Sequence, residues 1–465
     1  MKTEPVEGIT LPAGTALPRR RLVFGIIAIG LFMISVDQTI IATALGAIEQ
    51  DFSVPVTWTS WTLTIYALGQ IIAMSVAGRL ADEFGRRRIF LLAVGIFTAA
   101  SLCCGLANSV YLLVALRFVQ SLGAGAVLPS ATGIVAEYFG PSRDRAVGTF
   151  NSIFPIGGII GPILGGLLVA GWTWRAVFLV NVPFGLLLLV LGWRFIARQP
   201  PKPSGKVDVV GIALLASLTL SAMLGMSVLG SGRSPGDPLF WAPELLAGVL
   251  VIAFLRHITR HPAPVVAPVL LHGHGFGAMN IVNLLFGAAV LGFGALVPVY
   301  AQWRYGMDPL SSGTVLTARA VGTICLSGVC VLALRRIGNR IPMILGFGVL
   351  AVGLFLLTAA PRGGMSPYEW LSMSSAITGV GMGIAVPATN NAGLHLSPDR
   401  VAAITGLRGM FRQVGAIISV SVASALVSRS SDPGIAQARA FAVFAVLLLG
   451  AIPLILRIPE HRGRW

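Results

Sequence analysis

The chain has 465 residues, of which 55% are hydrophobic and 11% are charged, and its mean hydropathy is +0.85. Soluble globular domains carry about 25% charged residues, so this composition excludes a soluble protein of the same length. The net charge of +16 would suit a nucleic-acid-binding protein, but the basic residues fall between apolar runs of about 20 residues, which indicates a polytopic helical membrane protein without a nucleic-acid partner.

Fourteen apolar runs are long enough to span a bilayer. They lie at about 22–48, 57–79, 88–107, 109–137, 146–169, 173–195, 208–230, 240–256, 276–302, 311–334, 341–360, 366–391, 401–428 and 438–457. We predict an all-α polytopic membrane protein made of two six-helix bundles plus two extra inserted helices. The predicted domains are a tail at 1–21, a bundle at 22–200, a linker at 201–262 that holds the inserted helices, a bundle at 263–457 and a tail at 458–465.

The distribution of Lys and Arg predicts the orientation. If both termini are cytoplasmic, 23 basic residues lie on the inner side and 6 on the outer side. Positive charge accumulates in cytoplasmic loops, so this bias favours an even number of spans with both ends inside the cell.

The first run carries an acid, Asp37, at its centre, which no other predicted run does. A carboxylate within a span costs about 2.5–3.5 kcal/mol on insertion scales and usually faces a cavity or a partner. Asp37 lies about 16 Å from the predicted outer end of its helix, and Arg117, in the fourth run, about 12 Å from the end of its own, so the two can meet. Burial raises the pKa of a carboxylate, whereas a nearby cation lowers it. A carboxylate under both influences can exchange a proton. A static ion pair is the alternative.

The second run ends in the sequence GRLADEFGRRR at 78–88. Gly78 permits close approach of another helix, Gly85 permits a tight turn, and Asp82 among arginines can form a charge cluster. We expect this segment to act as a cytoplasmic gate through Gly78, Arg79, Asp82, Gly85, Arg86 and Arg87. A plain loop enriched in positive charge is the alternative.

The fifth run contains GGIIGPILGG at 157–166. Gly157, Gly161, Gly165 and Gly166 recur at spacings of about three and four residues, which predicts a helix face without side chains where another helix packs closely. Pro162 removes a backbone hydrogen bond and tends to kink the helix. We interpret the run as part of a gate that is sealed in one state, with a merely well-packed glycine stripe as the alternative.

The chain also repeats itself. Residues 127–135 resemble residues 385–393, and the loop at 84–88 resembles that at 337–341. At a constant offset of 258, five residues match five others: Gly123, Gly125, Pro129, Gly148 and Gly157 correspond to Gly381, Gly383, Pro387, Gly406 and Gly415. Two similar halves with a binding site at their interface are a known plan for transporters.

The second half has no acid inside a predicted span, but it has Arg319, Arg408 and Arg412. Because Arg408 and Arg412 are four residues apart, they share a helix face. We infer an anionic, zwitterionic or neutral polar substrate, with arginines that snorkel toward an interface as the alternative. The candidate lining of the substrate pocket comprises these three arginines and Ile41, Tyr66, Gln120, Asn151, Phe154, Asn280, Asn283, Phe286 and Asn390.

Neither the cysteines nor the histidines show the spacing of a metal site. Cys103, Cys104, Cys325 and Cys330 lie in apolar runs, and we interpret them as small buried hydrophobic residues. His272 and His274 have no acid or cysteine nearby. The chain also lacks a G-x-x-x-x-G-K-[ST] string, so we expect no metal, no cofactor and no direct coupling to ATP.

Several segments resemble the major facilitator superfamily and, within it, the fourteen-span drug:proton antiporter branch. Residues 78–88 resemble the signature loop of the superfamily. VDQTIIATALGAI (36–48) is similar to the branch's first-span motif with Asp37 at the acidic position, and LRFVQSLGAGAVLP (116–129) is similar to the fourth-span motif with Arg117 at the basic position. GGIIGPILGG resembles the fifth-span antiporter motif, and residues 61–68 and 411–423 resemble the branch's second and late spans.

The resemblance implies the major facilitator fold, proton binding at Asp37 and a relay or gating role for Arg117. We therefore expect a monomeric, multi-pass transporter of the bacterial cytoplasmic membrane, with both termini in the cytoplasm. It would export a small organic compound in exchange for protons and draw on the proton gradient. A proton-coupled importer is the alternative, because only the motif at 157–166 argues against it. We expect no enzyme activity, because the spans hold neither a paired nucleophile and base nor a metal cluster.

Overall fold

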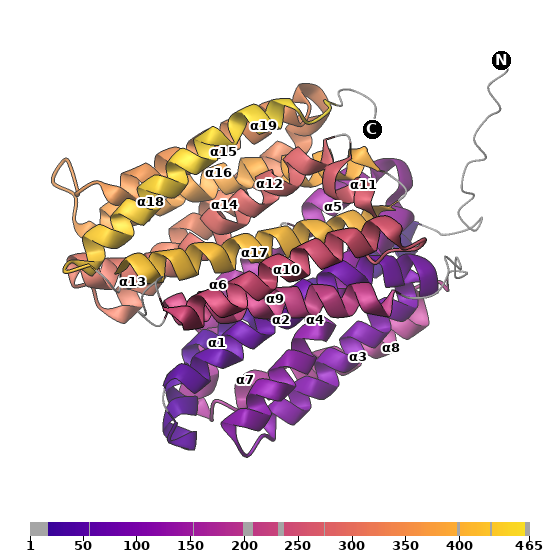
Figure 1. Ribbon diagram of the computed structural model, residues 1–465, viewed down its shortest axis with the longest axis horizontal. Coiled ribbons are helices and arrows are strands. Elements are labelled where there is room, and N and C mark those ends of the chain that lie inside the picture. Colours follow the sequence, from indigo (N-terminus) through magenta and orange to yellow (C-terminus); the bar gives the residue numbers. More distant parts are fainter. Residues whose placement is uncertain are drawn as a thin grey trace.

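The chain folds almost entirely into helices in the computed structural model (Figure 1). The predicted tails, the start of the linker and His274 lie wholly or partly outside the part that the structure describes. The described residues are 17–54, 56–151, 153–198, 208–230, 237–273, 275–397, 400–427 and 430–460.

The first half of the chain forms one helical bundle. Its helices are α1 (Leu17–Phe52), α2 (Val56–Phe84), α3 (Arg86–Gly105), α4 (Val110–Phe139), η1 (Gly140–Ser142), α5 (Arg143–Asn151), α6 (Ile153–Gly171), α7 (Ala176–Leu179) and α8 (Asn181–Phe195). Gly85 separates α2 from α3 with a φ of 94°, a backbone conformation that a side chain would strain.

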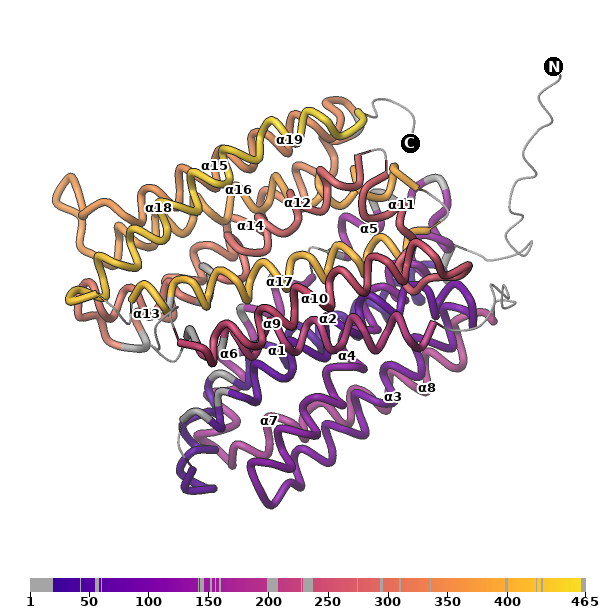
Figure 2. The backbone as a smooth tube through the Cα atoms, in the orientation of Figure 1, coloured from indigo at the N-terminus to yellow at the C-terminus, as the bar shows by residue number. Residues whose placement is uncertain are grey.

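Two inserted helices follow, α9 (Val209–Gly230) and α10 (Pro238–Arg260). An aspartate side chain caps the start of each: Asp208 accepts from the Gly211 N–H, and Asp237 accepts from the Leu239 N–H. The two helices lie side by side, and α9 also packs on α2 and α17 (Figure 2). The inserted pair therefore contacts both halves of the molecule.

The second half forms the other bundle. Its helices are α11 (Pro268–His272), α12 (Phe276–Gly287), the π-helical turn η2 (Ala288–Gly292), α13 (Phe293–Tyr305), α14 (Pro309–Ile337), α15 (Arg340–Thr358), α16 (Pro367–Leu396), α17 (Val401–Val427), α18 (Pro433–Gly450) and α19 (Ile452–Leu456). Buried apolar side chains gather into one large cluster in each bundle.

Twelve helices among the described residues are long and apolar enough to cross a membrane. A further pair, residues 276–292 and 296–305, passes the same test together but is bent by 50°. The apolar part of α6, Ile156–Gly171, is shorter than a full span. The helices therefore form a multi-pass membrane protein, and length and composition alone do not reach the predicted count of fourteen.

The glycines that match at an offset of 258 make equivalent contacts in the two bundles. A Cβ atom at Gly123 would meet α3 and one at Gly125 would meet α2, while Gly381 and Gly383 face α15 and α14 in the same way. Gly157 of α6 packs on α1, the first helix of its bundle, and Gly415 of α17 packs on α12, the first long helix of the second bundle. The two halves are thus built on one packing plan.

The same correspondence extends across the interface between the bundles. A Cβ atom at Gly148 of α5 would meet Val331 of α14, and one at Gly406 of α17 would meet the backbone of Met74 in α2. Each half therefore inserts the start of its fifth span against the second span of the other half. Both contacts lie toward the end of the molecule that carries the 84–88 loop.

The interpretation of the four cysteines is half right. Cys104 and Cys330 are buried, whereas Cys103 and Cys325 are exposed. In a membrane-spanning protein, an apolar run predicts burial in protein or contact with lipid equally well.

Candidate functional site

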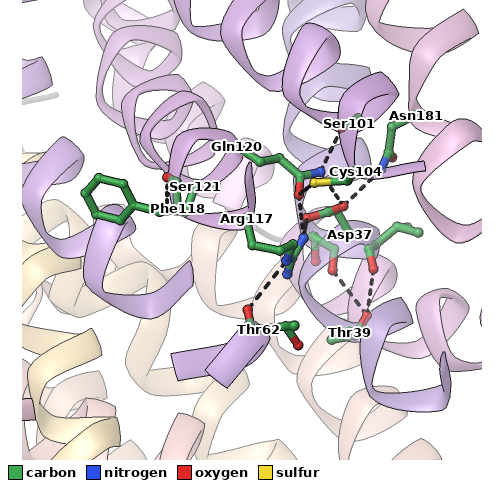
Figure 3. A network of polar contacts seen from close by, with 12 residues as sticks. Asp37, Thr39, Thr62, Ser101, Cys104, Arg117, Phe118, Gln120, Ser121 and Asn181 are labelled. Carbon is green, nitrogen blue, oxygen red and sulfur yellow. Dashed lines mark hydrogen bonds and ion pairs between the residues drawn. The ribbon is translucent and has the colours of Figure 1, made fainter. Parts of the chain in front are cut away.

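Asp37 lies in the middle of α1 and faces Arg117 of α4 (Figure 3). An Nη1 atom of Arg117 lies 3.0 Å from Oδ2 of Asp37, and each side chain is only 1% exposed. The structure thus brings together the acid of the first predicted run and the base of the fourth. Both charges are removed from solvent, so the pair must satisfy its polar atoms within the protein.

Amide side chains complete the surroundings of Asp37. Its Oδ1 atom accepts hydrogen bonds from Gln120 Nε2 at 3.0 Å and from Asn181 Nδ2 at 2.9 Å. Gln120 also donates to Ser101 Oγ at 2.7 Å, and its Oε1 accepts from Arg117 Nη1 at 2.6 Å. Gln120 therefore bridges the two charged groups and connects them to α3, as Figure 3 shows.

Arg117 has further partners besides the carboxylate. Its Nε atom donates to the Thr62 carbonyl oxygen at 3.5 Å, and its guanidinium carbon lies 4.0 Å from the centre of the Tyr66 ring and 5.6 Å from that of Phe178. A cation above an aromatic face gains about 2 kcal/mol or more when both are desolvated. Arg117 can therefore remain buried even when its bond to Asp37 weakens.

The 78–88 segment forms a second polar cluster at one end of α2 and α3. Arg86 makes ion pairs with Asp82 and with Glu137, both at 3.3 Å, and it donates to the Gly133 carbonyl oxygen at 2.8 Å. Arg86 therefore ties α3 to α2 and α4.

The other residues of that segment reach further. Arg79 lies 3.9 Å from Glu83 and donates to the Ala263 carbonyl oxygen, and Arg87 donates to the Trp193 carbonyl oxygen. A Cβ atom at Gly78 would overlap the backbone of α17 at Ala402. The segment thus joins α2 closely to the second half.

Helix α6 packs on α1 through its glycines. A Cβ atom at Gly157 would overlap Ser35, one at Gly161 would overlap Thr39, and one at Gly165 would overlap Thr43. Ser35 also donates to the Phe154 carbonyl oxygen. Gly166 and Pro162 lie off this contact on the exposed side of α6, so the close packing follows a four-residue spacing.

In the second half, Arg412 of α17 reaches toward α12 and α16. Its Nε atom donates to Asn283 Oδ1 at 2.8 Å and an Nη2 atom donates to Asn390 Oδ1 at 3.3 Å, while its guanidinium carbon lies 4.8 Å from the centre of the Phe286 ring. Arg408, 4% exposed, donates to the Asn390 carbonyl oxygen at 3.3 Å. Within the described residues, neither arginine forms an ion pair with a carboxylate.

Comparison with known proteins assigns the chain to a family. The model of the Major Facilitator Superfamily matches residues 27–304 and 282–465. The chain belongs to the major facilitator superfamily. Members of this superfamily are transporters rather than enzymes, so the sites described above belong to a membrane carrier for a small molecule.

Curated relatives of this superfamily carry names of drug resistance and export. The chain is 29% identical to the multidrug resistance protein B homolog of Mycobacterium tuberculosis, covering 87% of this chain and 75% of the relative. It is 28% identical to the multidrug transporter protein MdtP of Bacillus subtilis (90% and 77%). It is 29% identical to the tetracenomycin C resistance and export protein of Streptomyces glaucescens (94% and 84%). These relatives agree with the drug:proton antiporter branch that the motifs resemble.

Solved structures share the fold. The human organic anion transporter MFSD10 superposes with a TM-score of 0.69 at 16% identity, covering 94% of this chain and 99% of that one. The proton:xylose symporter XylE superposes with a TM-score of 0.66 at 14% identity, covering 96% of this chain and 97% of that one. Because both identities are low, the two superpositions establish the major facilitator fold and nothing about the substrate.

The remaining predicted pocket residues of this superfamily member have varied surroundings. Ile41 is fully buried in an apolar cluster, and Phe154 packs beside the core of the first bundle. Asn280 donates to the Leu270 and Leu271 carbonyl oxygens, which holds α11 against α12, and Arg319 donates to the Val290 carbonyl oxygen in η2. The side chain of Asn151 lies outside the described residues.

The sequence interpretation missed part of the polar network around Asp37. Asn181 and Ser101 both contact it or its bridge, yet neither was among the predicted residues. Asn181 does carry a signal, because it is the one amide in the apolar run at 173–195. A polar side chain in such a run usually faces a partner.

Proposed function

We propose that this protein is a proton-coupled antiporter of the bacterial cytoplasmic membrane that exports a small organic compound by alternating access. Both termini lie in the cytoplasm, and the carrier acts as a monomer. The observation that carries the proposal is the buried Asp37–Arg117 pair, whose two charges can separate without leaving Arg117 unpartnered. The names of the relatives support export, because they describe multidrug transport and tetracenomycin C export.

The proposed proton step is local. When a proton binds Asp37, the carboxyl group becomes neutral and its attraction to Arg117 falls. Arg117 keeps its bond to Gln120 Oε1, its bond to the Thr62 carbonyl oxygen and its place above the Tyr66 ring. The site therefore has two arrangements in which its polar atoms have partners, and a proton can bias the equilibrium between them.

The proposed conformational step joins that site to the gate. α4 carries both Arg117 and Gly133, whose carbonyl oxygen binds Arg86 of the 78–88 segment. α1 carries Asp37 and packs on the glycine face of α6. A change in the charge pair thus acts on α4, which contacts the 78–88 segment, and on α1, which contacts α6. Rocking of the two halves around a central site requires such a connection.

We propose that the arginines of the second half recognise an anionic, zwitterionic or neutral polar substrate. Among the described residues, Arg412 binds only amide oxygens and the face of Phe286, and Arg408 binds only a carbonyl oxygen. The Nδ2 atom of Asn390, beside them, is buried without a partner in the described part of the chain. A negatively charged or hydrogen-bonding group would satisfy this cluster better than a cation.

Transport into reconstituted liposomes tests the proposal. With an acidic lumen, an antiporter lets protons leave and accumulates substrate inside, whereas an importer that couples the two in the same direction would expel preloaded substrate. We expect accumulation of the anionic dye carboxyfluorescein, weak accumulation of the cationic dye ethidium and no effect of the gradient in Asp37→Asn liposomes. Expulsion of preloaded dye would contradict the antiport direction, and preference for ethidium would contradict the substrate class.

A further inference from the structure

A pocket of about 440 Å³ opens at the C-terminal end of α10, outside both sites described above. Arg79 of the 78–88 segment binds the chain just beyond α10, so this end of α10 lies at the same end of the molecule as that segment. The pocket is lined by Leu214, Ala253, Arg256, His257, Arg260, His261 and Pro262.

The lining is cationic. Arg256 and Arg260 are exposed and four residues apart, so they project from one helix face. Neither makes an ion pair within the described residues, and no acid lines the pocket. A planar guanidinium donates two parallel hydrogen bonds to phosphate, and two such groups on one face form a site for an anion.

The nearby histidines and Asp208 are less suited to a metal ion, although their ligand atoms lie within 4.8 Å of one another. Asp208 is only 3% exposed, and its oxygens already accept from His257 at 2.7 Å, from the Gly211 N–H at 2.8 Å and from the Val265 N–H at 3.0 Å. The Nδ1 atom of His261 accepts from the Ala263 N–H. The carboxylate that a cation would need thus already accepts three hydrogen bonds, and the two permanent positive charges of Arg256 and Arg260 oppose a cation.

An apolar stripe leads along α10 to the pocket. Leu245, Val249 and Ile252 are 65%, 63% and 53% exposed, and their spacing of four and three residues continues to Arg256 on the same face. Exposed apolar side chains on a spanning helix meet lipid tails. The pocket therefore lies where the head of a lipid would sit if its acyl chain followed this stripe.

We propose that this pocket binds the phosphate headgroup of an anionic phospholipid in the leaflet on the side of the 78–88 loop. The shared chemistry is a phosphate anion, and the apolar stripe commits the site to phosphate that is carried by a lipid. Basic pockets at the membrane surface bind such headgroups through several cationic side chains at once.

The site is connected to the gate through a short chain of contacts. His257 in the pocket binds Asp208, and Asp208 accepts from the Val265 N–H. Two residues earlier, the Ala263 carbonyl oxygen accepts from Arg79 of the 78–88 segment. A bound headgroup therefore contacts α10, which is connected to the 78–88 segment. This connection gives the inserted pair α9 and α10 a role in regulating transport. The regulatory role rests on the proposed function, whereas binding of the headgroup does not.

Lipid binding can be measured on the purified full chain in nanodiscs. We compare thermal stability and native mass spectra in phosphatidylcholine alone and with phosphatidylglycerol. The Arg256→Gln/Arg260→Gln variant should bind phosphatidylglycerol about twenty-fivefold more weakly, since each surface arginine contributes about fivefold. The matched control is Arg194→Gln/Arg198→Gln, which removes two exposed arginines that are also four positions apart, one in the last turn of α8 and one just beyond it, and should leave binding unchanged.

Each other outcome contradicts the proposal. An equal loss in the control pair would mean that diffuse positive charge attracts the lipid. Equal protection by millimolar inorganic phosphate would indicate a soluble anion, and stabilisation by Zn²⁺ that disappears in His261→Gln would indicate a metal site. If the double variant does not fold, Arg260→Gln alone should lose about fivefold in phosphatidylglycerol binding, and unchanged binding would overturn the assignment.

Discussion

The two halves of this transporter share a packing plan but differ in the charges that they bury. In the first half, Asp37 and Arg117 neutralise each other, and Gln120 bridges them. In the second half, Arg408 and Arg412 have amide, carbonyl and aromatic partners but no carboxylate among the described residues. One half thus holds a neutralised ion pair, and the other holds arginines whose charge no carboxylate among the described residues neutralises.

The offset of 258 makes the difference explicit. The positions that match Arg117 and Gln120 are Ser375 and Thr378, and the positions that match Arg408 and Arg412 are Phe150 and Phe154. Each half therefore places its arginines where the other has small polar or aromatic side chains. The comparison teaches that a duplicated scaffold can hold an acid–base pair in one half and, among the described residues, arginines without a carboxylate partner in the other. The exchange involves a few buried residues, while the glycine contacts remain.

Removal of the acid from the first half should have the largest effect. Asp37→Asn keeps the size of the side chain and can still accept a hydrogen bond from Arg117, but it cannot gain or lose a proton. We expect uptake driven by an acidic lumen to fall to the level of empty liposomes. Asp51→Asn is the control, because Asp51 is an exposed acid of the same helix. Gradient-driven uptake by Asp37→Asn would reject the role of this carboxylate.

Addition of an acid to the second half should have the next largest effect. Asn283→Asp places a carboxylate 2.8 Å from the Arg412 guanidinium and makes this half resemble the first. Because the arginine is then neutralised, we expect carboxyfluorescein transport to fall about tenfold, mainly through a higher KM. Asn283→Ser removes the oxygen without adding charge and should lose less. Equal losses would show that charge at Arg412 does not select the substrate.

Alanine at the matched glycines tests what the halves share. Gly157→Ala would overlap Ser35, and Gly415→Ala would overlap the backbone of α12 at Leu284. We expect each to lower the free energy of unfolding by about 1–3 kcal/mol, as overpacking does elsewhere. Gly158→Ala is the control, since its Cβ atom would meet nothing within 4 Å. A stable Gly415→Ala beside an unstable Gly157→Ala would break the proposed equivalence.

The inserted helices have no twin, and Asp208 tests how they are held. Burial raises the pKa of Asp208, but hydrogen bonds from His257, Gly211 and Val265 outweigh burial and lower it below its ordinary value of 3.8. Its stabilising effect is therefore complete above pH 3.8 and is lost as the pH falls through the lowered pKa. Asp208→Ala should cost about 2 kcal/mol near neutral pH.

Asn at position 208 separates the two roles of Asp208, which are to cap α9 and to supply a negative charge to His257. Asp208→Asn can still cap α9 through its side-chain oxygen, so it should cost less than Asp208→Ala in thermal unfolding of the purified protein. Both variants should lose the acid-dependent part of the stability. Identical unfolding of wild type and Asp208→Ala at pH 7 would show that the hydrogen bonds of Asp208 do not hold α9 and α10 in place.

The sequence predicted the central pair because Asp37 is an isolated acid in an apolar run, and burial of a charge demands a partner. It predicted the repeat because glycines at helix contacts cannot be replaced freely. It could not place Asn181 beside Asp37, because that contact joins helices 144 positions apart in sequence. Nor could it show that Asn280 holds α11 in place or that Gly166 faces away from α1, since both depend on the rotation of a helix about its axis.

The reciprocal contacts of Gly148 with Val331 and of Gly406 with Met74 have a consequence for how the two bundles move against each other. Each bundle supplies the glycine to one of these contacts and the opposing helix to the other. Separation of either contact therefore tilts a whole bundle and strains the other contact. We therefore expect the two contacts to part together, which couples the two bundles at the end of the molecule that carries the 84–88 loop.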